Sequence, residues 1–362
     1  MNENYVTLGQ VCDKGSSNIA QKDLAEREGQ YPIYGAAGLI KNVDFAHQKQ
    51  PYIAVVKDGA GIGRVMKLPA YSSVIGTMQY IFPKESVDID YLFYALQHMN
   101  LGKYFSGSTI PHIYFRDYQK ERLKLPVMEV QQRQADTLSR IDAISAYGQR
   151  QIALMDEIVK SRFVEMFGDA DLAQTRPEWR SVSEIGTVVG GATPKTTNDE
   201  FWDGLYRWIT PAELENESGY IFDSVRKITE AGVKSCALTE LPVGTVILSS
   251  RAPIGKVAIA GNTFYCNQGF KNIICNQDIN PVFLYSLLRM NTRYLNSLGR
   301  GATFKEISKA IVENIRIPVP PRMHQDRFAA FVAEVDKSKL AVKQSLENLE
   351  TLKKSLMQQY FG

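Results

Sequence analysis

The sequence SRFVEMFG, residues Ser161–Gly168, returns near the end of the chain as SLMQQYFG, residues Ser355–Gly362. The offset between the two copies, from Gly168 to Gly362, is 194 residues. Other pairs keep nearly this spacing and the same order: Gly107-Ser108-Thr109 with Gly301-Ala302-Thr303, Leu125-Pro126-Val127 with Ile317-Pro318-Val319, Ile62–Val65 with Ile254–Val257, and Ile141-Asp142 with Val335-Asp336. A period this long predicts duplication of a whole domain rather than a short repeat unit.

Each copy follows one internal plan. A strand-rich region punctuated by glycine and proline comes first, as at Tyr52–Val56 and Thr245–Leu248. A short amphipathic helix is expected next, over Tyr91–Met99 and Val282–Met290, and Asn280-Pro281 supplies the second with a cap and a first-turn proline. A Gly/Ser/Thr loop, an apolar strand ending in proline and a long stretch without proline complete the copy.

The two long stretches, Glu129–Met166 and Met323–Tyr360, carry apolar residues at alternating spacings of three and four. This pattern predicts long helices with a coiled-coil seam, each about 57 Å long. Four residues interrupt the stripes: Ser145, Gly148, Lys339 and Lys353. Each helix could cap its own domain, but the duplication favours an antiparallel pair in which each seam covers the other.

Composition excludes several classes of protein. The chain has 362 residues, 42 Lys plus Arg against 39 Asp plus Glu, and 44% hydrophobic residues, which indicates two folded domains rather than a disordered chain. A net charge of +3 gives no polybasic footprint, so any DNA contact must come from local patches. The four cysteines include no C-x-x-C pair, and no run reaches the roughly 18 apolar residues of a membrane span. A reducing cytoplasm is the expected compartment.

Several motifs resemble a known family. The segments Gly191-Ala192-Thr193-Pro194-Lys195, Phe201-Trp202-Asp203-Gly204 and Trp208-Ile209-Thr210-Pro211 are similar to the opening of a target-recognition domain in type I restriction–modification specificity subunits. Gly107–Ile113 resembles that family's Gly-Ala-Thr-x-Pro-His loop. Ile317-Pro318-Val319-Pro320 resembles its Ile-Pro-x-Pro strand, and the helices ending in Phe-Gly resemble its spacer regions.

The resemblance implies an α+β fold, with two pseudo-repeated mixed α/β target-recognition domains separated by two long antiparallel helices that form a coiled coil. The expected boundaries are a first recognition domain at 1–128, a central spacer helix at 129–168, a linker at 169–178, a second recognition domain at 179–321 and a distal spacer helix at 322–362.

The resemblance also implies a non-catalytic protein that recognises a split, asymmetric target on double-stranded DNA, one domain per half-site. Major-groove edges one turn apart are about 34–36 Å from each other, so rods of this length can act as a ruler between the domains. The expected partners are two methyltransferase subunits and restriction subunits, with S-adenosylmethionine, Mg²⁺ and ATP bound by those partners and none by this chain. The first domain lacks the Trp-Ile-Thr-Pro signature, and its start at Tyr31–Gly35 looks like another subclass, so the half-sites should differ.

DNA readers use amides and guanidinium groups for base edges, and hydroxyls and amines for phosphates. We expect Gln79 and Gln268 to contact bases, and Lys195, Lys271, Arg300 and Lys305 to contact phosphates. The remaining candidates for DNA contact are Lys57, Arg64, Ser108, Thr109, His112, Thr193, Thr196, Asn198, Asn267 and Thr303. For any single residue a solvated loop side chain is an equal alternative.

Three patterns resemble catalytic or metal-binding sites, but each lacks a required residue or spacing. Gly59–Gly63 resembles a nucleotide-binding loop, but its counterpart Arg251–Gly255 has lost two glycines, so a tight turn is the better interpretation. Asn280–Phe283 lacks the second proline of an Asn-Pro-Pro-Phe methyltransferase motif and is taken as a helix cap. The four histidines show no metal-ligand spacing. The tryptophans, Trp179, Trp202 and Trp208, are expected in the core.

Apolar helix residues beside the seam, Leu154, Ile158, Leu340 and Leu352, exceed what a two-helix contact buries and are expected to bind the partner subunits. They could instead pack on their own domains. Two other functions stay open: a duplicated-domain coiled-coil scaffold that binds protein or carbohydrate, and a fused modification enzyme, which the absent catalytic motifs disfavour. A neighbouring methyltransferase gene would separate the first interpretation from the scaffold.

Overall fold

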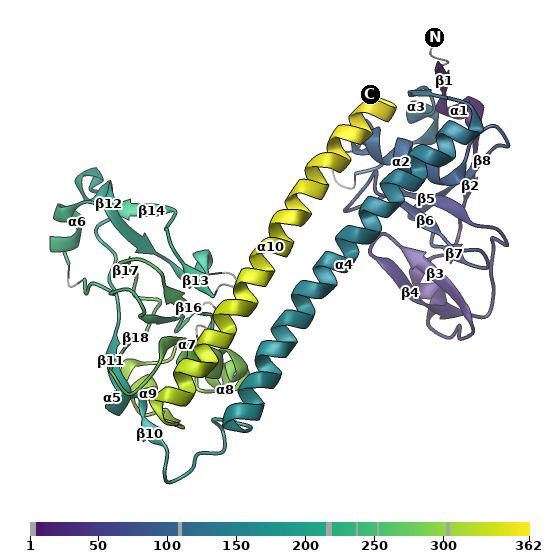
Figure 1. Ribbon diagram of the computed structural model, residues 1–362. Helices are drawn as coiled ribbons and strands as arrows, with labels where there is room; N and C mark the ends of the chain where they lie inside the picture. The colour runs from purple at the N-terminus through teal and green to yellow at the C-terminus, as the bar shows by residue number, and fades with distance from the viewer. Residues whose placement is uncertain (1–4, 108–110, 215–218, 237, 252, 302–304) are drawn as a thin grey trace. The chain divides into compact units, whose positions relative to one another are not determined.

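The protein is described here from a computed structural model, which covers residues 5–107, 111–214, 219–236, 238–251, 253–301 and 305–362. The chain forms two compact units. The first unit is Met1–Arg150 with Val342–Gly362, and the second unit is Gln151–Ala341. Each unit combines a strand-rich globular part with portions of both long helices (Figure 1).

The first unit is built on an antiparallel sheet in the order β2–β8–β5–β6, formed by Cys12–Ser16, Met78–Pro83, Tyr52–Val56 and Val65–Leu68. A second sheet has the order β4–β3–β7, formed by Gly38–Val43, Tyr31–Gly35 and Ser73–Val74. β1 and β9, Tyr5–Thr7 and Arg122–Lys124, pair antiparallel. Helix α2, Ile89–His98, packs its apolar face on the first sheet, and its N-terminus is capped by Asp88, whose carboxylate accepts from two backbone amides.

The second unit has a sheet in the order β11–β18–β15–β16–β13, formed by Gly186–Val189, Asn272–Cys275, Val246–Leu248, Val257–Ala260 and Tyr220–Ile221. The sheet β14–β12–β17 consists of Arg226–Ile228, Trp202–Ile209 and Tyr265–Cys266. β10 pairs with β19, Arg180–Ser181 with Arg316–Ile317. Helix α7, Pro281–Met290, is capped by Asn280 and contributes its apolar face to the core.

The two units share one topology. The order β2–β8–β5–β6 recurs as β11–β18–β15–β16, and each three-stranded sheet contains one parallel pair, β3 with β7 and β12 with β17. In each unit the first strand also pairs with the strand that leads into a long helix. β13 is an addition in the second unit. The repeat expected from sequence is therefore a repeat of the whole α+β domain.

Short helices complete the loops. The α-helical turns are α1 at Leu8–Val11, α3 at Phe115–Tyr118, α5 at Val182–Ile185, α6 at Glu230–Lys234, α8 at Thr292–Ser297 and α9 at Lys309–Glu313. The 3₁₀ turns are η1 at Gln21–Leu24, η2 at Leu101–Tyr104, η3 at Asp199–Phe201 and η4 at Pro211–Glu213.

The long helices are α4, Met128–Phe167, and α10, Arg322–Phe361, of 40 residues each. The expected helices are thereby confirmed, and each extends one residue further at both ends. Among the described residues, no helix combines the length and the apolar content that crossing a bilayer requires.

Within each unit the two long helices lie side by side and run antiparallel (Figure 1). In the first unit Asp142 pairs with Lys353 at 2.5 Å, and further along α4 Gly148 contacts Leu346. In the second unit Asp156 pairs with Lys339 at 2.7 Å, and the Arg162 guanidinium lies 5.8 Å from the centre of the Phe331 ring. In both units, residues later in α4 contact residues earlier in α10, as an antiparallel pair requires.

These contacts correct three details of the expected seam. Gly148 does not interrupt it: the residue is buried, and a Cβ built on it would lie 2.8 Å from Leu346 Cδ2, so glycine permits a close approach of α10. Lys339 and Lys353 do not interrupt it either, because each forms an ion pair with an aspartate of α4. The sequence stripes show apolar contacts, but they do not show these polar ones.

Candidate nucleic-acid interface

In the second unit two buried tryptophans hold the loop that carries Thr193 and Lys195. The Trp208 indole donates to the Ala192 carbonyl at 3.0 Å, and the Trp202 indole donates to the Lys195 carbonyl at 3.3 Å. The two rings pack edge to face with centroids 5.1 Å apart. The core position expected for these tryptophans is confirmed, and their N–H groups fix the backbone of the loop above them.

The same loop lies tightly against β17. The Ala192 amide donates to the Cys266 carbonyl at 3.0 Å, and a Cβ on Gly191 would lie 2.0 Å from that oxygen. Only glycine fits such a close backbone approach. The approach brings Thr193 to Gln268, whose Oε1 accepts from the threonine hydroxyl at 2.6 Å. Gln268 is exposed, so two of the predicted contacts form one polar surface.

Two other residues of this region have internal roles. The Asn267 side-chain oxygen accepts from the Gly269 amide at 2.8 Å and so shapes the turn. Lys271 donates to Glu306 at 3.1 Å and to Ser250 at 3.3 Å, and its side chain is 14% exposed. Since the Lys271 charge is neutralised inside the unit, this lysine is not the free phosphate ligand that the sequence predicts.

Glu306 organises the neighbouring loop. Its backbone exchanges hydrogen bonds with Arg300, and its carboxylate lies 4.0 Å from the Arg251 guanidinium. Arg300 and Lys305 are exposed beside it, as phosphate contacts require. Arg251 was not predicted as a site residue, although it stands in the segment that replaced two glycines of the first copy.

Arg226 is a further candidate that the sequence patterns did not indicate. Arg226 is exposed on β14, and its guanidinium carbon lies 3.5 Å from the centre of the Trp202 ring. Among the described residues it has no carboxylate partner. The stacking therefore fixes a cation next to the loop of Lys195 without neutralising it. Its separation of 31 residues from Lys195 gave no signal in the sequence.

Three remaining candidates of this unit lie on its surface or outside the described residues. Thr196 is exposed, and Asn198 caps η3 by accepting from the Glu200 amide at 3.2 Å. Thr303 lies outside the described residues.

In the first unit the equivalent loops meet at His112. The Gly59 amide donates to the Pro111 carbonyl at 3.0 Å, and Nδ1 of His112 contacts the Asp58 carboxylate. Burial and the nearby Lys57 lower the pKa of His112, so the imidazole is mainly neutral at pH 7. Lys57 Nζ lies 3.9 Å from Asp58, so the predicted residues Lys57 and His112 share one acidic partner. Ser108 and Thr109 lie outside the described residues.

Two other predicted DNA contacts of this unit differ in their exposure to solvent. Arg64 is exposed and donates to the Ala36 carbonyl at 2.8 Å. Gln79 is buried, and its Oε1 accepts from the Tyr118 hydroxyl at 2.9 Å. A side chain enclosed in this way does not reach a base edge, so the predicted base contact by Gln79 is wrong for this structure.

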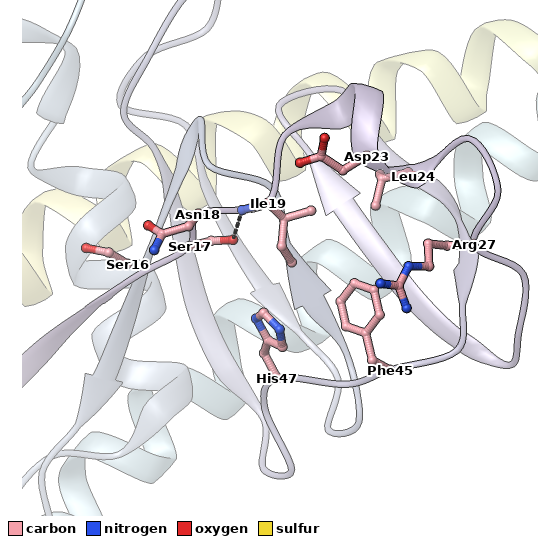
Figure 2. A pocket seen from close by; sticks show the side chains of 9 residues that line it. All are labelled: Ser16, Ser17, Asn18, Ile19, Asp23, Leu24, Arg27, Phe45 and His47. Carbon is pink, nitrogen blue, oxygen red and sulfur yellow. Dashed lines mark hydrogen bonds between the residues drawn. The ribbon is translucent and has the colours of Figure 1, made fainter.

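Figure 2 shows a cavity of about 520 Å³ at the end of β2, for which the sequence gave no signal. Arg27 pairs with Asp44 at 3.0 Å and lies over the Phe45 ring, which contacts His47. The cavity is open and mixed in polarity, with these lining residues: Ser16, Ser17, Asn18, Ile19, Asp23, Leu24, Arg27, Phe45 and His47. Because Asp44 neutralises Arg27, we assign the cavity no part in DNA binding.

Burial raises the pKa of the Cys12, Cys266 and Cys275 thiols to about 12, which keeps all three protonated at neutral pH. Within the described parts of the chain, no three His, Cys, Asp or Glu side chains gather as a metal site would require.

The predicted partner-binding residues are all exposed on their helices: Leu154, Ile158, Leu340 and Leu352. α4 exposes three further apolar side chains, Met128, Ile144 and Tyr147, in the portion that belongs to the first unit. Exposed apolar side chains at helical spacing are typical of an interface with another helix.

The arrangement matches a known family model over residues 2–154 and again over 177–351. The chain belongs to the type I restriction modification DNA specificity domain family. The two matched ranges correspond to the two copies of the repeat, so the resemblance seen in the motifs is confirmed over most of the chain. These matches do not favour the alternative of an unrelated scaffold.

Individual relatives agree with the family. The MjaIX specificity subunit of a type I restriction enzyme from Methanocaldococcus jannaschii is 37% identical over 209 residues, which is 56% of this chain and 48% of that protein. The chain thus matches about half the length of this relative. The specificity subunit of a type I restriction-modification system from M. genitalium shares the fold, with a TM-score of 0.64 at 17% identity over 100% of this chain and 97% of that one.

A chain from a solved structure described as concerning complex assembly and conformational transition of the type I R-M system also shares the fold. Its TM-score is 0.55 at 16% identity, and the match covers 99% of this chain and 98% of that one.

Proposed function

We propose that this chain is the non-catalytic specificity subunit of a type I restriction–modification complex and recognises a split, asymmetric target on double-stranded DNA. The observation that carries the proposal is the duplicated domain. In each copy, loops bring polar and charged side chains to a surface of that unit. Family membership supports it. Each recognition domain would contact one half-site, with the recognition domains at 1–128 and 179–321, the spacer helices at 129–168 and 322–362, and a linker at 169–178.

Base reading in the second half-site is assigned to Gln268. Its amide oxygen has two lone pairs, so the Thr193 hydroxyl fixes the side chain and leaves one lone pair and both N–H donors free. A glutamine with this capacity reads adenine through N6 and N7 in the major groove. Lys195 follows Thr193 in the same loop, and Arg226 stacks on the Trp202 ring that holds this loop. Arg300 and Lys305 supply phosphate contacts that position the domain.

The long helices act as the ruler between the half-sites. Their antiparallel contacts, the buried Gly148 and the two Asp–Lys pairs support a coiled coil of fixed register. Helix length then sets the number of unspecified base pairs, while the loops choose the bases. The two functions are separable because they lie in different elements.

The partners are two methyltransferase subunits and, with them, restriction subunits. The exposed apolar side chains of α4 and α10 form the proposed docking surface for the methyltransferase subunits. S-adenosylmethionine, Mg²⁺ and ATP would be bound by the partners and none by this chain. This function takes place in the cytoplasm, where the host DNA is accessible.

The experiment is methylome sequencing of the host with and without this gene, with the methyltransferase gene intact and its product verified. We expect one split, adenine-methylated motif to disappear on deletion and to return on complementation. Methylation that stays unchanged in the deletion strain while the methyltransferase is present would contradict the proposal.

A further inference from the structure

Two glutamines, Gln131 and Gln325, occupy the same position in the two copies, 194 residues apart. Each is the fourth residue of a long helix, α4 or α10. Their side chains are 1% and 0% exposed, although glutamine is a residue that usually lies at the surface. A buried amide requires partners for both donors and for its oxygen.

In the first unit all of these partners are backbone groups of the globular part. Gln131 Oε1 accepts from the Asp88 amide at 2.9 Å. Its Nε2 donates to the Ser86 carbonyl at 3.1 Å and to the Pro126 carbonyl at 2.9 Å. Asp88 is the cap of α2, so one side chain links the start of the long helix to the start of the core helix.

The second unit repeats the arrangement. Gln325 Oε1 accepts from the Asn280 amide at 2.7 Å, and Asn280 is the cap of α7. Its Nε2 donates to the Asp278 carbonyl at 3.0 Å and to the Pro320 carbonyl at 2.7 Å. The same three bonds therefore form in both copies, to equivalent backbone positions.

Glutamine is the one common side chain that provides this set of one acceptor and two donors at this reach. Glutamate has no donor at neutral pH and would face two carbonyl oxygens. Alanine would leave one amide and two carbonyls without a partner. Since hydrogen bonds have a narrow range of angles, whereas apolar contacts are not directional, the three bonds fix the angle between helix and domain as well as the contact.

We infer that Gln131 and Gln325 are positioning residues that hold each recognition domain at one orientation on its spacer helix, and that they thereby restrict the complex to targets with one gap between the half-sites. This inference rests on the proposed function. Loosening one joint widens the range of accepted gaps and leaves the base preference of both half-sites unchanged, because the hydrogen bonds of both glutamines among the described residues go to other segments than the reading loops.

The test uses the complex of this chain with its methyltransferase subunit and a plasmid library. The library carries the native half-sites with gaps from two base pairs shorter to two longer, and methylation is counted by sequencing. The variants are Gln131→Ala, Gln131→Glu and Gln325→Ala. Gln149→Ala, an exposed change on α4, is the matched control, and Ile53→Val weakens the first core away from the joint.

We expect the ratio of methylation at the native gap to that at neighbouring gaps to fall by about tenfold in each joint variant, which corresponds to about 1.4 kcal/mol of lost discrimination between gaps. Gln149→Ala keeps the wild-type ratio. Ile53→Val reduces methylation at all gaps in proportion, as a structural defect does. If the alanine variant does not assemble, the Gln131→Glu ratio decides the question.

Joint variants that keep the wild-type ratio, or that lose methylation in proportion at every gap as Ile53→Val does, would overturn the inference. A wild-type complex that methylates no split target would instead overturn the proposed function, so the two failures are distinct.

Discussion

The two units share a scaffold but differ in their reading surfaces. In the first unit an isolated β-bridge pairs Asp58 with His112. The equivalent bridge in the second unit pairs Arg251 with Glu306. The acidic and basic partners have exchanged places. By contrast, the glutamine joints and the strand orders are the same in both units. The backbone plan has therefore been kept, while the acidic and basic positions at these bridges have been exchanged.

The second difference concerns how each loop is supported. Indole N–H groups hold the loop at Ala192–Lys195 in the second unit. The corresponding region of the first unit is packed with aliphatic residues, Leu24, Ile33, Val43 and Ile75. Substitutions at matching positions should consequently have different effects in the two units.

The largest effect is expected for Trp208→Ala. Removing this buried ring leaves a cavity and an unpaired carbonyl, at a cost of about 3–5 kcal/mol in the free energy of unfolding of the second unit. Hydrogen exchange followed by mass spectrometry should show faster exchange in second-unit peptides and no change in first-unit peptides. Leu205→Ala, at a side chain 89% exposed, is the control and should leave exchange unchanged. Faster exchange in both units would contradict an effect confined to the second unit.

The next-largest effect distinguishes Gln268 from Gln79, both of which the sequence predicts as base contacts. Gln268→Ala should reduce affinity for the native second half-site by about 10- to 100-fold, the value of one bidentate base contact. It should not alter affinity for DNA whose second half-site is already scrambled. Gln79→Ala should lower stability and leave the discrimination between half-site sequences intact, because Gln79 is buried. Binding titrations with DNA that carries a native or a scrambled sequence at each half-site measure both effects. Equal loss of discrimination in the two variants would contradict the assignment.

A smaller effect distinguishes two lysines. Lys305→Ala should weaken binding to all sequences and reduce the slope of log affinity against log salt by about 1, as one lost phosphate contact predicts. Lys271→Ala should leave that slope unchanged, since Glu306 already neutralises Lys271. Titrations at several salt concentrations provide the slopes. A drop of equal size for Lys271→Ala would place that lysine on the DNA.

The smallest effects are expected in the helix pair. Lys339→Met and Lys353→Met should each change the free energy of unfolding by about 1 kcal/mol, the upper end of the range for exposed ion pairs, because both pairs are partly buried. The first change should cost more, because Lys339 is the more buried of the two. Urea denaturation measures the difference, and Lys354→Met, at an exposed pair within one helix, is the control. The opposite order would contradict the expected effect of burial.

Much of the fold followed from local patterns. The long helices, the duplicated domain and the buried tryptophans depend on spacing and hydrophobicity, which a sequence displays directly. Gly148, Lys339 and Gln79 were misinterpreted for a common reason: their partners lie far along the chain, at Leu346, Asp156 and Tyr118. The pairing of Lys339 spans 183 residues. Pairings of this kind depend on tertiary geometry.

The sequence indicated which loops form the candidate site, but not which side chains within them pair with one another. Gln268, Thr193 and Lys195 lie together because of a glycine and two indoles. Lys271 looked identical to them in sequence, yet it is neutralised by Glu306. The joints at Gln131 and Gln325 were missed because a glutamine at the start of a helix is usually solvated.

If base reading and spacing belong to different parts of the chain, lengthening the helix pair should change only the spacing. A heptad is duplicated in each of the facing helix segments, Ile144–Arg150 and Ser345–Thr351, which lengthens the pair by about 10 Å. The methylated motif is then determined by sequencing in the host. We predict that both half-sites stay the same and that the gap grows by about three base pairs, at about 3.4 Å each. Altered half-sites with an unchanged gap would contradict the account.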